Sequence, residues 1–295
     1  MGTFHHDRHE LHGITVVVDT SGPEIFVGRC DDMDDRQILG VFEGETGAML
    51  TPYDNAPHKG VLNRSPDDLN KRVARYYDMG MQLHFHTVGD GAVRAALDAL
   101  EYARERGSEE HRNLRHTFSH LGLVDPTDMP RFAELNAAAS FTLAWGDTTE
   151  WTINLELPAL GRERVARLYP IRSLLAAGAV VLGGSDWIYG DLDPLVSIET
   201  GITRDDAYGP ISTSDFEVFD DETDELATLI DAYTINGAWQ LHAEERSGSI
   251  EVGKRADMVI YDRNLFEIPT GEISEATVDL TLFDGRVVYR RPDKR

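Results

Sequence analysis

Residues 80–120 read GMQLHFHTVGDGAVRAALDALEYARERGSEEHRNLRHTFSH, and they contain two short apolar runs separated by one long helical pattern. The runs at residues 80–86 and 116–120 have the length and apolar content of buried strands. Between them, residues 89–106 carry apolar side chains at helical intervals, which predicts a helix. This strand, helix, strand order is typical of parallel βα units.

The same alternation continues on both sides of this segment and predicts an α/β fold with a parallel sheet. Further strands are predicted at residues 13–19, 137–143 and 179–184, and further helices at residues 66–77, 126–135, 170–177 and 225–236. Residues 205–221 are polar, with Gly and Pro, and predict a long loop. From residue 248 onward, short β runs at residues 258–261 and 277–289 predict a few antiparallel strands.

The charge of the chain limits its partners. The 295 residues include 28 Lys and Arg against 52 Asp and Glu, a net charge of −24, which would repel nucleic acid and anionic membranes. Acidic residues are spread along the chain and lysine is scarce, a pattern typical of salt-adapted proteins; an ordinary acidic protein is the alternative.

Targeting and redox features are sparse. No apolar run approaches the roughly 20 residues of a membrane span, and residues 1–11 have no apolar signal-peptide core, so we expect a cytoplasmic protein. The single cysteine, Cys30, excludes a disulfide framework.

Three side chains at predicted strand ends suggest chemistry. His86 and His120 end two predicted strands, and Asp186 follows the strand at residues 179–184. The carboxyl ends of parallel strands collect catalytic groups in α/β barrels, and two imidazoles with a carboxylate suit a divalent metal such as zinc, manganese or iron. Each residue also has a structural alternative, a hydrogen-bonded buried histidine or an aspartate that caps a turn.

Several ordered segments resemble the YtcJ-like branch of the metal-dependent amidohydrolases, the amidohydrolase 3 family. They are HTVGDGAV (86–93), RHTFSH (115–120), YPIRSLL (169–175), GSD (184–186), AYTINGA (232–238) and GSIEVGKRAD (248–257). The resemblance extends from about residue 40 to the end. It implies an incomplete TIM (β/α)8 barrel of the metal-dependent hydrolase type at residues 1–245, followed by the C-terminal part of a small β-sandwich at residues 246–295.

The resemblance also implies an activity. His86, His120 and Asp186 would bind the metal, and Asp186 would act as the general base that takes a proton from metal-activated water. The implied reaction is hydrolysis of a non-peptide, amide-type carbon–nitrogen bond in a small-molecule substrate. The expected cofactor is a divalent metal, zinc first, with at most one ion per chain.

The chain departs from the family pattern in three places. No H-x-H precedes the strand predicted at residues 13–19, Asp35 stands where the family has a metal-bridging lysine, and Ser119 replaces a glutamate. His84 shares a strand face with His86 and is a candidate further metal ligand, the alternative being a histidine without function. The histidines at positions 5, 6, 9 and 12 are a second candidate chelating group.

These departures leave a second hypothesis about function. The chain would then be a catalytically silent amidohydrolase remnant that binds or supports other molecules, or a subunit that needs a second polypeptide. A barrel that lacks its first strand exposes unpaired strand edges. We therefore expect a homo-oligomer or a complementing polypeptide as partner, and metal stoichiometry would separate the two hypotheses.

Overall fold

A computed structural model describes the backbone of two strands at residues 15–19 and 25–27, and then residues 41–62, 64–147, 149–187, 191–204 and 222–292. Several features of the sequence lie outside the described residues: the N-terminal histidine cluster, Cys30, Asp35 and the predicted loop at residues 205–221.

The main sheet has six strands in the order β2-β1-β3-β4-β5-β6. Their bounds are β1 (Thr15–Asp19), β2 (Ile25–Val27), β3 (Gln82–Thr87), β4 (Thr117–His120), β5 (Ala138–Thr142) and β6 (Val180–Gly184). Strands β1, β3, β4, β5 and β6 are parallel, and β2 pairs with β1 in the antiparallel direction. All five predicted parallel strands are therefore confirmed, and β2 is an addition that the sequence did not indicate.

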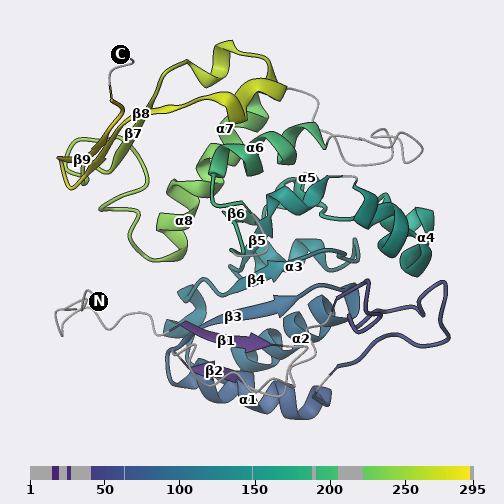
Figure 1. The fold of residues 1–295 in the computed structure, drawn as a ribbon. Helices are drawn as coiled ribbons and strands as arrows, with labels where there is room; N and C mark the ends of the chain where they lie inside the picture. The colour runs from purple at the N-terminus through teal and green to yellow at the C-terminus, as the bar shows by residue number, and fades with distance from the viewer. Residues whose placement is uncertain are drawn as a thin grey trace.

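Helices follow the parallel strands as βα units require. They are α1 (Pro66–Asp78), α2 (Asp90–Arg106), α3 (Met129–Glu134), α4 (Leu157–Val165), α5 (Ile171–Ala176), α6 (Pro194–Thr203), α7 (Glu222–Tyr233) and α8 (Ile235–Gln240). Figure 1 shows α1 and α2 at the β2 end of the sheet and α6, α7 and α8 beyond β6. The helix predicted at residues 225–236 is two helices, because Thr234 between them has non-helical angles of φ −126 and ψ −94.

Short helical turns complete the connections. They are the 3-10 helices η1 (Glu109–Asn113), η2 (Leu143–Gly146), η5 (Leu265–Glu267) and η6 (Thr270–Glu275), and the π-helix η3 (Thr152–Glu156). The π-helix, α4 and α6 were not predicted. Among the described residues, no helix has the length and apolar content needed to cross a bilayer.

The core lies between the parallel sheet and the helices that cover one of its faces. Phe85 of β3 stacks on Phe118 of β4 with ring centroids 4.7 Å apart, and Phe118 meets Phe132 of α3 edge-on at 5.1 Å. All three side chains are fully buried. Because side chains alternate along a strand, burying Phe85 places His84 and His86 on the opposite face of β3.

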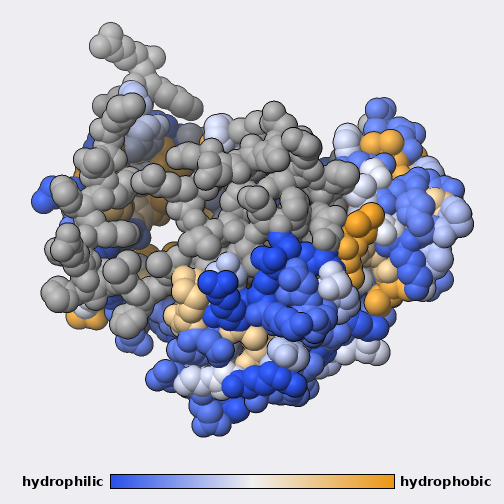
Figure 2. Space-filling model, turned by 90° about the horizontal axis from the view of Figure 1, so that it is seen from below, coloured by the Kyte–Doolittle hydropathy of each residue, from blue (hydrophilic) through white to orange (hydrophobic). Residues whose placement is uncertain are grey.

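The C-terminal strands form a separate three-stranded sheet in the order β7-β8-β9. Strands β7 (Met258–Tyr261), β8 (Val278–Phe283) and β9 (Arg286–Arg290) are antiparallel, which confirms the prediction for this region. This sheet lies beside α8, at the opposite end of the molecule from α1 (Figure 1). On the face drawn in Figure 2, the coloured surface is mostly hydrophilic, as expected for a chain with a charge of −24.

Candidate active site

The first histidine of the site lies at the end of β3. In the parallel register His86 is opposite Ser119 of β4, and Thr87 is opposite His120. β3 ends at Thr87 and Gly89 is the N-cap of α2, where a Cβ would lie 2.3 Å from the carbonyl oxygen of Ala48. Glycine is therefore needed at this turn, and the turn fixes the direction in which the strand presents His86.

His120 is presented by an unusual backbone conformation at the end of β4. Its φ is +71°, and that of Leu121 is +50°, values that non-glycine residues adopt only when surrounding contacts hold them. Those contacts are present: the amide of Leu121 donates to the carbonyl of Thr87 at 2.8 Å, and the amide of Leu123 donates to that of Val88 at 2.9 Å. The β4 turn is thus tied to the end of β3, and this brings the two histidines together.

The two imidazole rings are in contact, with centroids 4.4 Å apart and an interplanar angle of 64°. On its other side, the His120 ring lies parallel to the indole of Trp145, at 5.4 Å and 9°. Burial, together with the nearby His86 and His84, lowers the pKa of His120 to about 3. His120 is therefore neutral at physiological pH, and this is the form of histidine that binds a metal.

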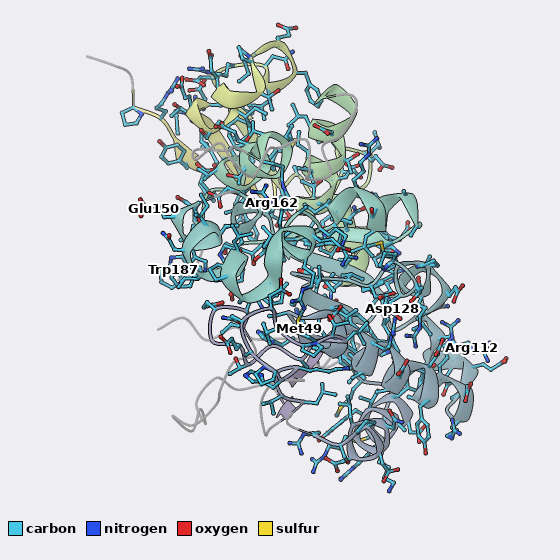
Figure 3. The ribbon with its side chains drawn as sticks, turned by 90° about the vertical axis from the view of Figure 1, so that its right-hand side faces the viewer. Met49, Arg112, Asp128, Glu150, Arg162 and Trp187 are labelled. Carbon is cyan, nitrogen blue, oxygen red and sulfur yellow. The ribbon has the colours of Figure 1, made fainter. Side chains whose placement is uncertain are left out.

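Asp186 follows β6, with a φ of +46°. Burial raises the pKa of its carboxyl and the proximity of His86 lowers it, so Asp186 and His86 interact electrostatically. Trp187 follows with 65 % of its surface exposed, and Figure 3 shows it at the same edge of the molecule as Glu150. A Cβ at Gly183 of β6 would lie 2.3 Å from the ring of Tyr233, so this glycine allows close packing of the sheet against α7.

One cavity of about 830 Å³ contains all three predicted residues: His86, His120 and Asp186 line it together. The structure therefore brings the ends of β3, β4 and β6 to one site, as parallel-strand geometry predicts. Glu43, Asp147 and Glu156 also line this cavity and were not predicted as site residues. No pattern in the sequence marks them, since isolated acidic residues in an acidic chain resemble a solvated surface.

The residues present match part of a metal site. Two neutral imidazoles and a carboxylate are a donor set that zinc accepts, and the Nδ1 atom of His120 is buried without a hydrogen-bond partner. However, no group of three or more His, Cys, Asp or Glu side chains in the described part of the chain is arranged to hold a metal ion. The histidine pair fits a metal, whereas Asp186 shares the cavity without completing a ligand group.

His84 occupies a different environment from His86. Its Nε2 atom is hydrogen-bonded to the hydroxyl of Ser119, and its side chain lines a second cavity, of about 960 Å³, between the sheet and the C-terminal strands. Burial lowers its pKa to about 4, and His86 contributes to the shift. Ser119, which stands where the family pattern has a glutamate, is thus the hydrogen-bond partner of His84, the candidate further metal ligand.

Arg204, at the C-terminal end of α6, is buried beside the first cavity. Its guanidinium donates to the carbonyl of Leu168 at 2.8 Å and to the carbonyl of Tyr169 at 3.3 Å. Only 2 % of its surface is exposed. These bonds indicate that Arg204 holds the segment before α5 in place.

Comparison with known proteins decides the family. The model of the family described as "Amidohydrolase family" matches residues 8–289. The chain belongs to the amidohydrolase family. It is 29% identical to the N-substituted formamide deformylase of Arthrobacter pascens over 237 residues, which cover 79% of this chain and 41% of that protein. It is 23% identical to the "Putative amidohydrolase YtcJ" of Bacillus subtilis (strain 168) over 273 residues, covering 92% of this chain and 49% of that protein.

A solved structure agrees with the amidohydrolase fold. The uncharacterized metal-dependent hydrolase from Pyrococcus horikoshii OT3 superposes with a TM-score of 0.62 at 21% identity, over 79% of this chain and 44% of that chain. The parallel sheet and the antiparallel C-terminal sheet fit a partial TIM barrel with part of a β-sandwich, which confirms the predicted fold class. The chain spans about half the length of the curated amidohydrolases it matches.

Proposed function

We propose that this amidohydrolase hydrolyses a non-peptide, amide-type carbon–nitrogen bond of a small molecule with the help of a divalent metal. One observation carries the proposal: His86, His120 and Asp186, which come from three different strand ends, line a single cavity. The resemblance to an N-substituted formamide deformylase supports N-substituted formamides and related N-acyl amines as the first substrates to test.

His86 and His120 would hold the metal, with zinc as the first candidate and at most one ion per chain. Asp186 lines the same cavity and would become the third ligand by moving toward the bound ion. When bound, the metal would supply Lewis-acid polarisation of the scissile carbonyl and acidify the attacking water. The stacking of Trp145 on His120 supports this assignment, because it fixes the orientation of the imidazole before a metal arrives.

The carboxylate of Asp186 would move the proton. It would accept a proton from the water as the water attacks the carbonyl carbon, and then deliver that proton to the nitrogen as the carbon–nitrogen bond breaks. The products are a carboxylic acid, or formic acid from a formamide, and an amine. A general base of this kind is replaced least disruptively by asparagine, which keeps the shape and removes the proton acceptor.

The decisive experiment measures amine release from simple formamides by the chain loaded with zinc, manganese or iron, beside Asp186→Asn and a control, Asp231→Asn. Asp231 is an exposed residue of α7. Asp186→Asn is expected to lower the rate by about a thousandfold or more, which corresponds to about 4 kcal/mol of transition-state stabilisation. Parent-like activity in Asp186→Asn, or no hydrolysis by any metal-loaded form, would refute the proposed mechanism.

A second function, a silent remnant that binds ligands in this cavity, is favoured by one observation. No three candidate ligands in the described residues are arranged to hold a metal. Metal content after dialysis separates the two proposals, because a silent remnant would retain no ion, whereas the hydrolase would retain one. A complementing polypeptide would be identified by activity that returns only when both chains are mixed.

We also infer the wider setting of the protein. The charge of −24 supports a salt-adapted cytoplasmic protein with a small-molecule substrate and no nucleic-acid partner. The change from α8 to antiparallel strands supports a boundary near residue 245, with the barrel part before it and the sandwich part after it. A homo-oligomer is the expected assembly, and sedimentation at low and high salt would test it.

A further inference from the structure

The wall of the first cavity is acidic. Glu43 from the loop at residues 41–47, Asp147 after η2 and Glu156 at the end of the π-helix η3 line it together with Asp186. Among the described residues that line the cavity there is no lysine or arginine. These carboxylates come from four separate segments, so the tertiary structure and not a local run of acidic residues creates the negative wall.

Glu156 is the most deeply buried of these carboxylates, with only 6 % of its surface exposed. The hydroxyl of Thr152 is its hydrogen-bond partner, but no basic side chain of the described residues forms an ion pair with it. Burial, together with the charges of Glu43 and Asp147, raises the pKa of Glu156 to about 7. A buried carboxylate without a cation is costly to the folded state, and this one faces an open cavity.

The three unpredicted carboxylates all lie close enough to Tyr169 to act on it electrostatically. Burial raises its pKa, and the same three groups, Glu156, Glu43 and Asp147, raise it as well. The positive charge of Arg204 acts in the opposite direction. Because the Arg204 guanidinium is bonded to the carbonyls of Leu168 and Tyr169, it belongs to the protein framework and is not a mobile counter-ion for a ligand site.

Aromatic side chains line the same cavity. Trp145, Trp151 and Tyr169 are among its lining residues. Trp151 has 53 % of its surface exposed, although it is a large apolar side chain. The face of an indole ring attracts an organic cation, so the aromatic and acidic parts of this wall favour the same kind of ligand.

We propose that this cavity selects organic cations, so that the substrate carries an ammonium, guanidinium or quaternary ammonium group distant from the bond that is cleaved. This inference rests on the proposed function and adds its substrate class. The cleaved bond would lie beside His86, His120 and Asp186, and the cationic group would lie between Glu156, Glu43 and Trp151. A volume of about 830 Å³ is sufficient for a ligand of this size.

Binding tests the proposal without any reaction. Choline and 3,3-dimethylbutan-1-ol have nearly the same shape and differ in charge, and neither contains an amide bond. Two of the four tryptophans, Trp145 and Trp151, line the cavity, so tryptophan fluorescence together with calorimetry at pH 8.5 reports the affinity. Choline is expected to bind at least tenfold more tightly than the neutral alcohol, and equal affinities would overturn the proposal.

Variants of single carboxylates test which residues are responsible for the preference for a cation. Glu156→Gln is expected to weaken choline binding at least fivefold and to leave the affinity for the alcohol unchanged. Glu43→Gln, at an exposed position, is expected to weaken choline binding by a smaller factor and gives a second test should the buried variant misfold. Glu163→Gln, an exposed change on α4, is the matched control and should bind as the parent does. Choline affinity that is the same in Glu156→Gln and in the control contradicts the inference.

Kinetics separate this inference from the proposed function. N-formyl-1,5-diaminopentane carries an ammonium group, and N-formylpentylamine is its neutral counterpart. Selective choline binding without hydrolysis of either formamide would refute the proposed function and support the cation site. Hydrolysis of the two formamides with equal kcat/KM would refute the cation site and support the proposed function. A preference of tenfold or more for the ammonium substrate supports both.

Discussion

Glu156→Gln is expected to stabilise the protein at neutral and alkaline pH, although it removes a charged side chain from the cavity wall. Burial raises the pKa of Glu156 from an ordinary value of 4.5 to about 7. The folded state therefore binds this proton more tightly than the unfolded state does, and the contribution of Glu156 to stability is fully present below about pH 4.5. That contribution is lost as the pH rises through about 7.

The magnitude follows from the same difference. One pKa unit corresponds to about 1.4 kcal/mol, so a pKa moved from 4.5 to about 7 corresponds to about 3 kcal/mol of unfolding free energy. Glutamine resembles the protonated acid and its carbonyl still accepts the hydrogen bond of Thr152. Parent and variant are therefore expected to be equally stable at pH 4, and the variant is expected to be about 3 kcal/mol more stable at pH 8.

Urea unfolding followed by tryptophan fluorescence at several pH values between 4 and 8.5 measures this difference directly. The other carboxylates titrate in both proteins, so the difference between parent and variant isolates Glu156. Glu163→Gln, at an exposed position, should match the parent at every pH. A difference that does not change with pH, or a variant less stable at pH 8, would show that Glu156 has a cation partner in solution and that the burial argument is wrong.

The remaining predictions concern metal, salt and packing. After dialysis, elemental analysis should find at most one divalent ion per chain, and two retained equivalents would contradict the ligand set. The melting temperature should rise between 10 mM and 1 M KCl, and equally in NaCl, because the screening length of the charge of −24 falls from about 30 Å to about 3 Å; a flat midpoint would show that the acidity is incidental. Gly183→Ala should lower the free energy of unfolding by about 1–3 kcal/mol, because its Cβ would lie 2.3 Å from the Tyr233 ring. The control Gly237→Ala, whose Cβ would have nothing within 4 Å, should not destabilise the protein. Equal unfolding midpoints of the two variants would refute this packing argument.

The parallel strands were predictable because each is a short apolar run with little competing pattern. Strand β6 is a clear case: the run that ends in Gly183 and Gly184 is apolar, short and followed by a polar turn. The segment from η3 to α4 was not predictable, because it contains Pro158 and mixes charged and apolar residues without a helical period. A π-helix widens the turn by one residue, and no local propensity indicates this.

The residues of the candidate site also differ in whether the sequence could predict them. His86, His120 and Asp186 could be predicted, because each stands at the end of a recognisable strand, and parallel strand ends meet. Glu156 could not be predicted, since its raised pKa depends on burial in the folded chain and on the charge of Glu43, more than a hundred residues earlier. The sequence contains each of these residues, but only tertiary packing brings Glu43 close enough to raise the pKa of Glu156.

His84 shows the limit of reasoning from strand periodicity. Residues two apart share a face, and on that ground His84 was a candidate to bind a metal with His86. The structure places His84 in the second cavity, bonded to Ser119, while His86 faces His120 in the first. Two histidines on one face of a strand therefore need not belong to one site. The position of each histidine along β3 decides which residue of β4 it contacts, and the strand register, in which Thr87 pairs with His120, sets that position.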